Sequence, residues 1–561
     1  MFCRIIFLTL RVKRALRARR RRIVRVRKSV RNEKKPRNYR AHKCTLRPTT
    51  QPRWVARKQR PETRKMLEKL AKQTAIYGIS TIVVRFLSYL LTPIYTYTFT
   101  QAEYGIVTDI YALIPFALVL LSMGMESSYF RFTAKAEAES DSAEQILKEK
   151  RRVFATTWGA TIVAASLFFA VVMLLLDKVA EVMGAAYVAH PEYVILVVLI
   201  ILLDVAAMIP FSRLREQGRA LKFVALKALN VFVNVGLAIT FMAAGLFESE
   251  FGVGWVFVAN LVASLITLVA LIPTTERTVP TIERALLRRI FAYSLPLLIG
   301  GVAGTAGEFL DRQMIKYVLP EDISMAQLGV YGAITKIAVV MTLFTQMYRL
   351  AAEPFFLANF SREEFKESAA AAMKYFVMVS MVIFLGITLF RDLFALIVGR
   401  DFREGVDILP IILAGNILSG VWLNLSFWYK REEKTRYAVY VTFVGLGVSI
   451  VACLTLIPLT GGYAGAAWAR LAAEAAMVGV SYYLNRRYYP TPYDIKRIGE
   501  YAVLGVALYI AAEQFAQRCE PAAWLHYAFN TAVFLSFLWY AVWREKIDLG
   551  AMVKAVLKRR G

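Results

Sequence analysis

Long blocks of apolar residues recur along the chain, and they constrain its fold more than any other feature. Segments 153–176, 193–210 and 435–458 each approach the roughly 20 residues that a helix needs to cross a hydrocarbon layer about 30 Å thick. Apolar residues make up 57% of the chain, above the roughly 45 to 50% of an average soluble domain. The sequence therefore predicts an all-α integral membrane protein.

Fourteen such blocks can be read from the sequence, and we expect each to form one transmembrane helix. Their approximate bounds are 73–98, 104–130, 153–176, 193–212, 221–246, 251–273, 290–317, 327–352, 370–390, 405–429, 436–458, 462–484, 496–516 and 523–543. The connections between them indicate the orientation, because Lys and Arg are enriched in cytoplasmic loops. Even-numbered connections hold 25 of these residues and odd-numbered connections hold six. Both termini are therefore expected to be cytoplasmic.

Most of the net charge of +29 lies before the first span, because residues 1–65 hold 25 Lys and Arg against Glu33 and Glu62. The charge of the remaining chain is close to balanced, so we expect no nucleic-acid partner. Two interpretations of the segment remain open. It is either a polybasic arm on acidic lipids, or an extension upstream of a true start at Met66, which we favour.

Three pairs of motifs indicate an internal repeat. The pairs are Arg215-Glu216 with Arg431-Glu432, Gly252-x-Gly254 with Gly462-x-x-Gly465, and Tyr104-Gly105 with Tyr331-Gly332, at offsets of 216, 211 and 227 residues. Each copy contains six spans, so the copies have the same orientation and an axis along the membrane normal. We therefore expect two six-helix lobes, at 66–275 and 276–486, followed by two more helices and a basic tail at 487–561.

The run LAKQTAIYGISTIVVRFLSYLLTPIYTYTFTQAEYGIVTDIYA, which follows Met66, contains Arg85, Thr92-Pro93 and Glu103-Tyr104-Gly105. Together with Ser294-Leu295-Pro296 and Asp311-Arg312 in the seventh span, it resembles the polysaccharide transporter (Wzx-type) family of the multidrug/oligosaccharidyl-lipid/polysaccharide (MOP) exporter superfamily. The resemblance covers residues 66 to about 545. It implies a monomer in a bacterial cytoplasmic membrane, in contact with membrane lipids. The implied activity is outward transport of an undecaprenyl-diphosphate-linked glycan by a helix bundle that opens to each side in turn.

Basic residues within spans are candidates for binding an anionic headgroup, because a charge at the bilayer centre needs a partner or a wet cavity. Arg85 lies in the first span, and its guanidinium could donate two hydrogen bonds to a phosphate. A salt bridge between helices is the alternative for Arg85. Arg312 and Lys336 complete the candidate site, although Lys336 could instead pair with Asp311.

Acidic residues within spans are candidates for ion coupling. Asp204 could carry a proton if its surroundings are dry, or it could accept a hydrogen bond from Asn230 or Asn234. Glu308 and Asp311 lie near the end of the seventh span, where the spacing of Glu308 and Arg312 also permits mutual neutralisation. By the same spacing, Arg470 and Glu474 read as a structural ion pair. A proton or sodium gradient is therefore a possible energy source.

The seventh span contains Pro296, Gly300, Gly301 and Gly304. This composition permits either a bend or close packing against a neighbouring helix. We expect this helix to be the bending element.

Enzymatic functions find little support in the sequence. There is no D-x-D pair, the three histidines lie in the N-terminal segment or near span ends, and the chain has no Gly-Lys dipeptide and hence no Walker A loop. The four cysteines have no C-x-x-C spacing, so no metal or cofactor is expected. A polymerase would need a long outer loop, and the longest such stretches have about fifteen residues. A multidrug antiporter of the same superfamily remains the main alternative, because fold does not fix substrate.

Overall fold

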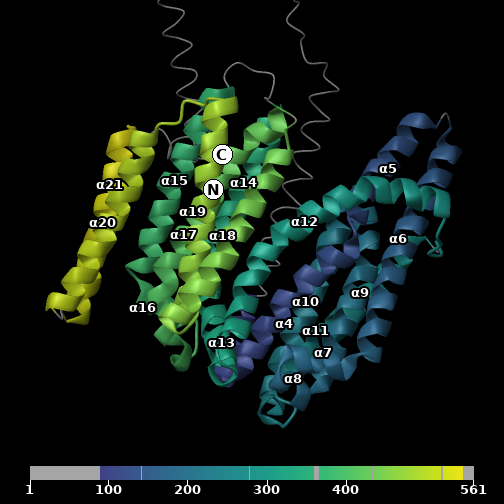
Figure 1. Cartoon of the computed structure of the whole chain (residues 1–561), viewed down its shortest axis with the longest axis horizontal. Coiled ribbons are helices and arrows are strands. Elements are labelled where there is room, and N and C mark those ends of the chain that lie inside the picture. The colour runs from purple at the N-terminus through teal and green to yellow at the C-terminus, as the bar shows by residue number, and fades with distance from the viewer. Residues whose placement is uncertain are drawn as a thin grey trace, which may run out of the picture. The chain divides into compact units, whose positions relative to one another are not determined.

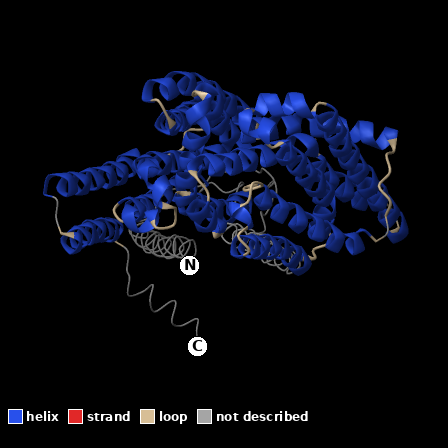
Figure 2. Ribbon diagram, turned by 90° about the horizontal axis from the view of Figure 1, so that it is seen from below, coloured by secondary structure: helices blue, strands red, loops and turns tan. Residues whose placement is uncertain are grey.

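The computed structural model describes residues 89–140, 142–276, 278–358, 365–432, 434–519 and 522–546. Every regular element in these ranges is an α-helix or a 3-10 helix, and Figure 2 shows no strand among them. The described residues up to Leu538 belong to one compact unit, Ala75–Leu538. All contacts discussed below lie within Ala75–Leu538.

Ten helices in the described ranges are long and apolar enough to cross a membrane. They are α4 (Gln101–Ser122) with α5 (Met125–Glu139), α6 (Ala143–Leu174), α9 (Pro191–Glu216), α10 (Ala220–Ala243), α11 (Gly254–Leu271), α12 (Arg284–Val318), α15 (Phe365–Thr388), α17 (Leu409–Arg431), α18 (Arg436–Thr460) and α21 (Ala523–Glu545). The count is eleven if the pair α13 (Glu321–Ile337) and α14 (Val339–Ala358), bent by 50°, is one span.

Three further helices occupy the positions of the remaining expected spans. They are α3 (Leu91–Thr98), α19 (Tyr463–Tyr488) and α20 (Ile495–Cys519). Short elements form connections: α7 (Leu176–Met183), α8 (Ala185–Ala189), η1 (Leu246–Glu248), η2 (Ile272–Thr275), α16 (Arg391–Ala395) and η3 (Arg400–Ile408). The prediction of an all-α membrane protein with about fourteen spans is confirmed.

Local sequence sets the ends of α4. The Thr100 hydroxyl accepts a hydrogen bond from the backbone N–H of Glu103, whose carboxylate accepts one from the Thr100 backbone N–H at 2.8 Å. This capping box satisfies two amides that the first helical turn leaves unpaired. At the other end, Met123 and Gly124 adopt left-handed backbone angles, with φ of 50° and 69°. The expected second span therefore consists of two helices, α4 and α5.

Glycines bring α4 and α13 into close contact. A Cβ atom added to Gly105 would lie 2.0 Å from the carbonyl oxygen of Met325, and one added to Gly329 would lie 2.0 Å from that of Gln101. Small residues of this kind let membrane helices approach closely and pack by van der Waals contact. The second and eighth spans are therefore joined backbone to backbone.

Helix α12 contacts two groups of helices: α4, α5 and α6, and α13, α18 and α19. Figure 1 shows it running between these two groups. Pro296, Gly300, Gly301 and Gly304 all lie within this uninterrupted helix. A Cβ atom on Gly301 would approach Val119 to 3.3 Å, whereas one on Gly300 or Gly304 would meet nothing within 4 Å. Close packing therefore accounts for Gly301 alone, and the bending role stays a prediction.

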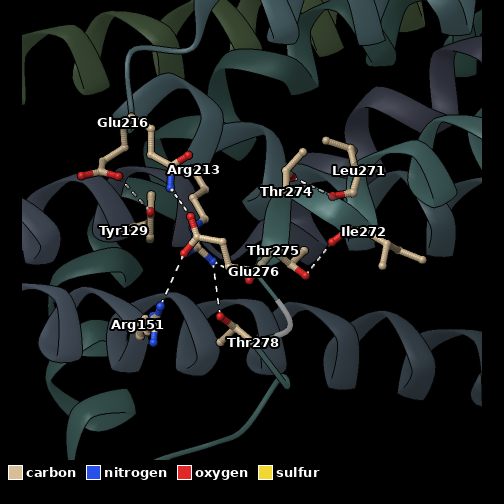
Figure 3. Close-up of polar contacts among 11 residues, drawn as sticks. Tyr129, Arg151, Arg213, Glu216, Leu271, Ile272, Thr274, Thr275, Glu276 and Thr278 are labelled. Atoms are coloured by element: carbon tan, nitrogen blue, oxygen red, sulfur yellow. Dashed lines mark hydrogen bonds and ion pairs between the residues drawn. The ribbon is translucent and has the colours of Figure 1, made fainter.

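The connection from α11 to α12 is fixed to neighbouring helices. Buried Arg213 of α9 donates to the carbonyl oxygen of Thr275 at 2.8 Å and pairs with Glu276 at 2.6 Å, as Figure 3 shows. Farther along, Arg152 of α6 pairs with Glu283 at 2.5 Å. The connection is thus held to α6 and α9 at both of these points.

Candidate functional site

Asp311 lies at the centre of a charged cluster in the second half of α12. Its side chain is 1% exposed and accepts a hydrogen bond from the Tyr331 hydroxyl of α13 at 2.8 Å. It also forms ion pairs with Arg470 of α19 at 3.3 Å and with Arg312 at 3.7 Å. A buried carboxylate requires such partners, because the loss of its hydration is otherwise costly. The possible pairing of Asp311 with Lys336 is not present.

Arg470 of α19 reaches across to Asp311 and lies 3.4 Å from the side-chain oxygen of Asn416. Side chains of α12, α13, α17 and α19 therefore meet at one point. The ion pair of Arg470 with Glu474, expected from their four-residue spacing, stays a prediction. The pairing with Asp311 joins two helices, so spacing along one helix cannot give it.

Lys336 of α13 lies near Arg312. Its Nζ atom is 5.2 Å from the centre of the Tyr89 ring, and Arg312 is close enough for the two positive charges to repel each other. Within the described ranges, no acidic side chain forms an ion pair with Lys336. The cation–π contact offsets only part of the cost of a cation inside a span. Arg312 and Lys336 together are suited to an anionic ligand.

A second buried cluster lies where α4 meets α12. The Lys316 Nζ atom is 2.5 Å from a carboxylate oxygen of Asp109, and both side chains are less than 5% exposed. Gln313 donates to the same carboxylate at 2.6 Å, and the Tyr187 hydroxyl of α8 donates to it at 2.7 Å. This carboxylate is therefore fully engaged by groups from two other elements.

Asp204 of α9 accepts a hydrogen bond from the Ser264 hydroxyl of α11 at 2.8 Å. The expected donors on α10 are not its partners, since Asn230 donates to Thr267 at 3.1 Å. Lys227 of α10 lies close enough to act on the Asp204 charge. The polar neighbour was thus predicted on the wrong helix, because the sequence does not give the relative rotation of packed helices.

Two of the predicted site residues cannot be placed. Arg85 lies outside the described residues, and the side chain of Glu308 is not described, although its backbone belongs to α12. Their roles as headgroup ligand and ion-coupling residue stay predictions. Tyr89, four residues after Arg85, is described and contacts Lys336.

An offset of 227 residues in the sequence relates the Lys316–Asp109 contact to the Lys336–Tyr89 contact. Between residues 85 and 110, six residues are identical to the residue 227 positions later: Arg85 and Arg312, Pro93 and Pro320, Tyr104 and Tyr331, Gly105 and Gly332, Thr108 and Thr335, and Ile110 and Ile337. At the same offset, Asp109 corresponds to Lys336 and Tyr89 to Lys316. The structure joins Lys316 to Asp109 and Lys336 to Tyr89. The same contact is therefore made twice, once by each copy of the repeat.

This offset is the signal that could have identified Asp109 and Lys316 from sequence. The match of Tyr104-Gly105 with Tyr331-Gly332 already defines it, and extension by five residues aligns Asp109 with Lys336. An acid and a base within spans, at equivalent positions of two repeats, would have marked both as candidates.

A family model for "polysaccharide biosynthesis protein" matches residues 70–360, more than half of the chain. The chain belongs to this family. The match includes Arg85, Asp311, Arg312 and Lys336 and ends before Arg470. No curated protein sequence matches the chain.

Solved structures of MOP transporters share its fold. The lipid II flippase MurJ in an inward closed conformation is 12% identical, with a TM-score of 0.65, and the match covers 83% of this chain and 99% of that one. An inward-facing multidrug resistance MATE family transporter of the MOP superfamily is 13% identical, with a TM-score of 0.59 and coverages of 77% and 99%. The MATE multidrug transporter DinF-BH is 16% identical, with a TM-score of 0.52 and coverages of 79% and 98%. These likenesses show that the chain shares the fold of these transporters.

Proposed function

We propose that this protein is a flippase. It moves an undecaprenyl-diphosphate-linked oligosaccharide from the cytoplasmic to the periplasmic leaflet of a bacterial inner membrane by alternating access. Membership of the polysaccharide biosynthesis family and the MOP transporter fold support a transport role over an enzymatic one. The excess of Lys and Arg in even-numbered connections supports cytoplasmic termini.

The neighbouring cations Arg312 and Lys336 carry the proposal for the substrate. Asp311 is engaged by Arg470, Arg312 and Tyr331, and Lys336 has no ion pair among the described residues. Two like charges close together inside a membrane repel each other, and an anion between them removes the repulsion. A diphosphate supplies that anion.

The chemistry of the two side chains fits a diphosphate. The Arg312 guanidinium stays charged at any physiological pH and can donate two parallel hydrogen bonds to phosphate oxygens. The ammonium of Lys336 adds a second, compact charge. Arg85 is the repeat equivalent of Arg312, and we propose it as a further headgroup ligand.

A multidrug antiporter for cationic compounds would need acidic groups available to its substrate. Three acids within the spans already have partners: Asp109 pairs with Lys316, Asp311 with Arg470, and Asp204 accepts from Ser264 near Lys227. Lys336, which has no ion pair among the described residues, adds a positive charge within its span, and this favours an anionic substrate.

Energy for export would come from the substrate gradient or from a proton or sodium gradient. Asp204, Glu308 and Asp311 are our candidates for coupling. Among the described residues, Asp204 is held by one hydroxyl hydrogen bond and a nearby cation, whereas Asp311 lies in direct ion pairs. Asp204 is therefore the better placed of the two to bind and release a proton.

Gene deletion with complementation tests the proposed function. Deletion should abolish the surface polysaccharide and cause lipid-linked repeat units to accumulate on the cytoplasmic side. The parent gene should reverse both effects, and an Arg312→Gln variant of equal abundance should not. Lys135→Gln is a matched control, because Lys135 is exposed and, among the described residues, pairs only with Glu139 of its own helix. Normal polysaccharide in the deletion strain would refute the proposal.

A further inference from the structure

We propose that the Asp109–Lys316 ion pair, together with Tyr187 of α8, is a latch that holds the two repeats together at the outer end of the spans. Here the outer end is the one at which α4 begins and α12 ends, which the distribution of Lys and Arg predicts to face the periplasm. The latch must open for substrate release, so this inference rests on the proposed alternating-access function.

The pair joins elements from different repeats. Asp109 lies in α4, in the second span, and Lys316 lies in the last turn of α12, in the seventh. Both side chains are less than 5% exposed, and Gln313 and Tyr187 donate to the same carboxylate. With water excluded, an ion pair that is hydrogen-bonded on all sides strongly resists separation of its partners.

Helices α7 and α8 form a strap that reinforces this contact. The strap connects α6 to α9 within the first repeat, yet it binds residues of the second repeat. The Tyr317 hydroxyl donates to the carbonyl oxygen of Val182 at 3.1 Å. The backbone N–H of Ala185 donates to the carboxylate of Glu321 at 2.8 Å. The strap is thus held by the ends of α12 and α13 on either side of the turn between them.

The second repeat makes the reciprocal contact. Its connection between α15 and α17 binds the turn between α3 and α4 of the first repeat. The Gln101 side chain donates to the carbonyl oxygen of Asp401 at 2.7 Å, and the Tyr97 hydroxyl donates to that of Leu396 at 2.9 Å. Each repeat therefore places the turn after its first span against the connection between the third and fourth spans of the other.

The Asp109–Lys316 contact and its counterpart in the other repeat differ in charge. We assign the latch to the contact that is an ion pair. Lys336 and Tyr89 stand where Asp109 and Lys316 stand in the other copy, and they make a cation–π contact 5.2 Å long. A cation–π contact is weaker than a buried, hydrogen-bonded ion pair. The Asp109–Lys316 pair is therefore the stronger of the two ties.

Water entering from the outer end would weaken this latch. Hydration of Asp109 and Lys316 restores the solvation that each lost on burial, so separation costs less once the site is wet. The latch is thus firm in the dry, closed state and releases progressively during opening. Tyr187 is fully buried and covers the pair in the closed state.

Thiol labelling tests the latch without any substrate. The reporter is Ser324→Cys, because Ser324 is buried at the start of α13, placed in a protein lacking the four native cysteines. A membrane-impermeant reagent outside should label this cysteine at least about tenfold faster in Asp109→Asn and in Lys316→Gln than in the parent. The exchanged pair, Asp109→Lys with Lys316→Asp, should bring labelling back to within about twofold of the parent. Equal labelling in all four proteins would overturn the latch.

A bridged variant covers the case in which the charge variants fail to fold. Cysteines at Ala185 and Glu321 join the strap to α13, and oxidation should abolish transport until a reductant is added. Cysteines at Ser249 and Trp255, whose side chains are hydrogen-bonded at the start of α11, form the control bridge that leaves transport unchanged. Unimpaired transport with the 185–321 bridge closed would show that this contact need not open. The labelling experiment needs no substrate, so it tests the latch even if the protein does not transport a lipid-linked oligosaccharide.

Discussion

Lys336 occupies in the second repeat the position that Asp109 occupies in the first, 227 residues earlier. Each of the two contacts the first span of the other repeat: Asp109 contacts Lys316, and Lys336 contacts Tyr89. The same backbone geometry thus presents an acid on one side and a base on the other. On the first side the charge is neutralised by Lys316, and on the second it faces Tyr89. We propose that this difference lets the first contact act as the latch and lets the second receive an anion.

The glycine crossing of α4 and α13 should be sensitive to one added methyl group. Gly329→Ala places a Cβ atom 2.0 Å from the carbonyl oxygen of Gln101, and overpacking of this kind costs about 1 to 3 kcal/mol. Gly479→Ala in α19 is the control, since nothing lies within 4 Å of its added atom and alanine favours helix by about 1 kcal/mol. Thermal unfolding should show a lower melting temperature for the first variant and no decrease for the second. Equal melting temperatures would contradict the close approach.

The bending role of α12 can be separated from stability. Gly300→Ala and Gly304→Ala add atoms in open space, so both variants should melt no earlier than the parent. Because the α11–α12 connection is fixed by Arg213 and Arg152, stiffening α12 should slow transport severalfold. Gly447→Ala in α18 makes the same chemical change in open space and should leave the transport rate unaltered. Transport at the parental rate in both α12 variants would show that Gly300 and Gly304 are not part of a hinge.

Arg470 is predicted to stabilise the Asp311 cluster. Arg470→Ala leaves a buried carboxylate without its cross-helix partner, which should lower the free energy of unfolding by about 3 to 5 kcal/mol. Adding Asp311→Asn should restore much of this loss, because the amide needs no counter-ion. Arg349→Ala is the control: its exposed pair with Glu353 is worth at most about 1 kcal/mol. A double variant as unstable as Arg470→Ala would disprove the pairing.

The number and type of the spans could be predicted from sequence, because runs of about twenty apolar residues leave few alternatives to a membrane helix. The break at Met123 and Gly124 was missed, since the apolar block at 104–130 runs from α4 into the first residues of α5. The partners of Asp311, Asp204 and Lys316 lie on other helices. Their identity depends on helix rotation and register, which local spacing does not encode.

Asp204 as a proton carrier predicts a specific change in coupling. Asp204→Asn keeps the size of the side chain but cannot titrate, so transport should continue and should no longer respond to an imposed pH gradient. Ser264→Ala removes the hydrogen bond to Asp204 but keeps the carboxylate, and should retain the response. Flux measured in vesicles at several pH gradients distinguishes them. A full pH response in Asp204→Asn would exclude this residue from coupling.

Translocation by purified protein in liposomes most directly tests whether Arg312 and Lys336 receive a diphosphate. The measured quantity is the rate at which a polyprenyl-diphosphate-linked oligosaccharide crosses the bilayer, compared with the melting temperature of each protein. We predict that Lys336→Gln slows translocation at least about tenfold while its melting temperature is equal to or above the parent's, because a cation repelled by Arg312 has been removed. Lys336→Arg should keep substantial activity. Translocation by Lys336→Gln at the parental rate, or a parent that carries cationic compounds and not this lipid, would contradict the assignment.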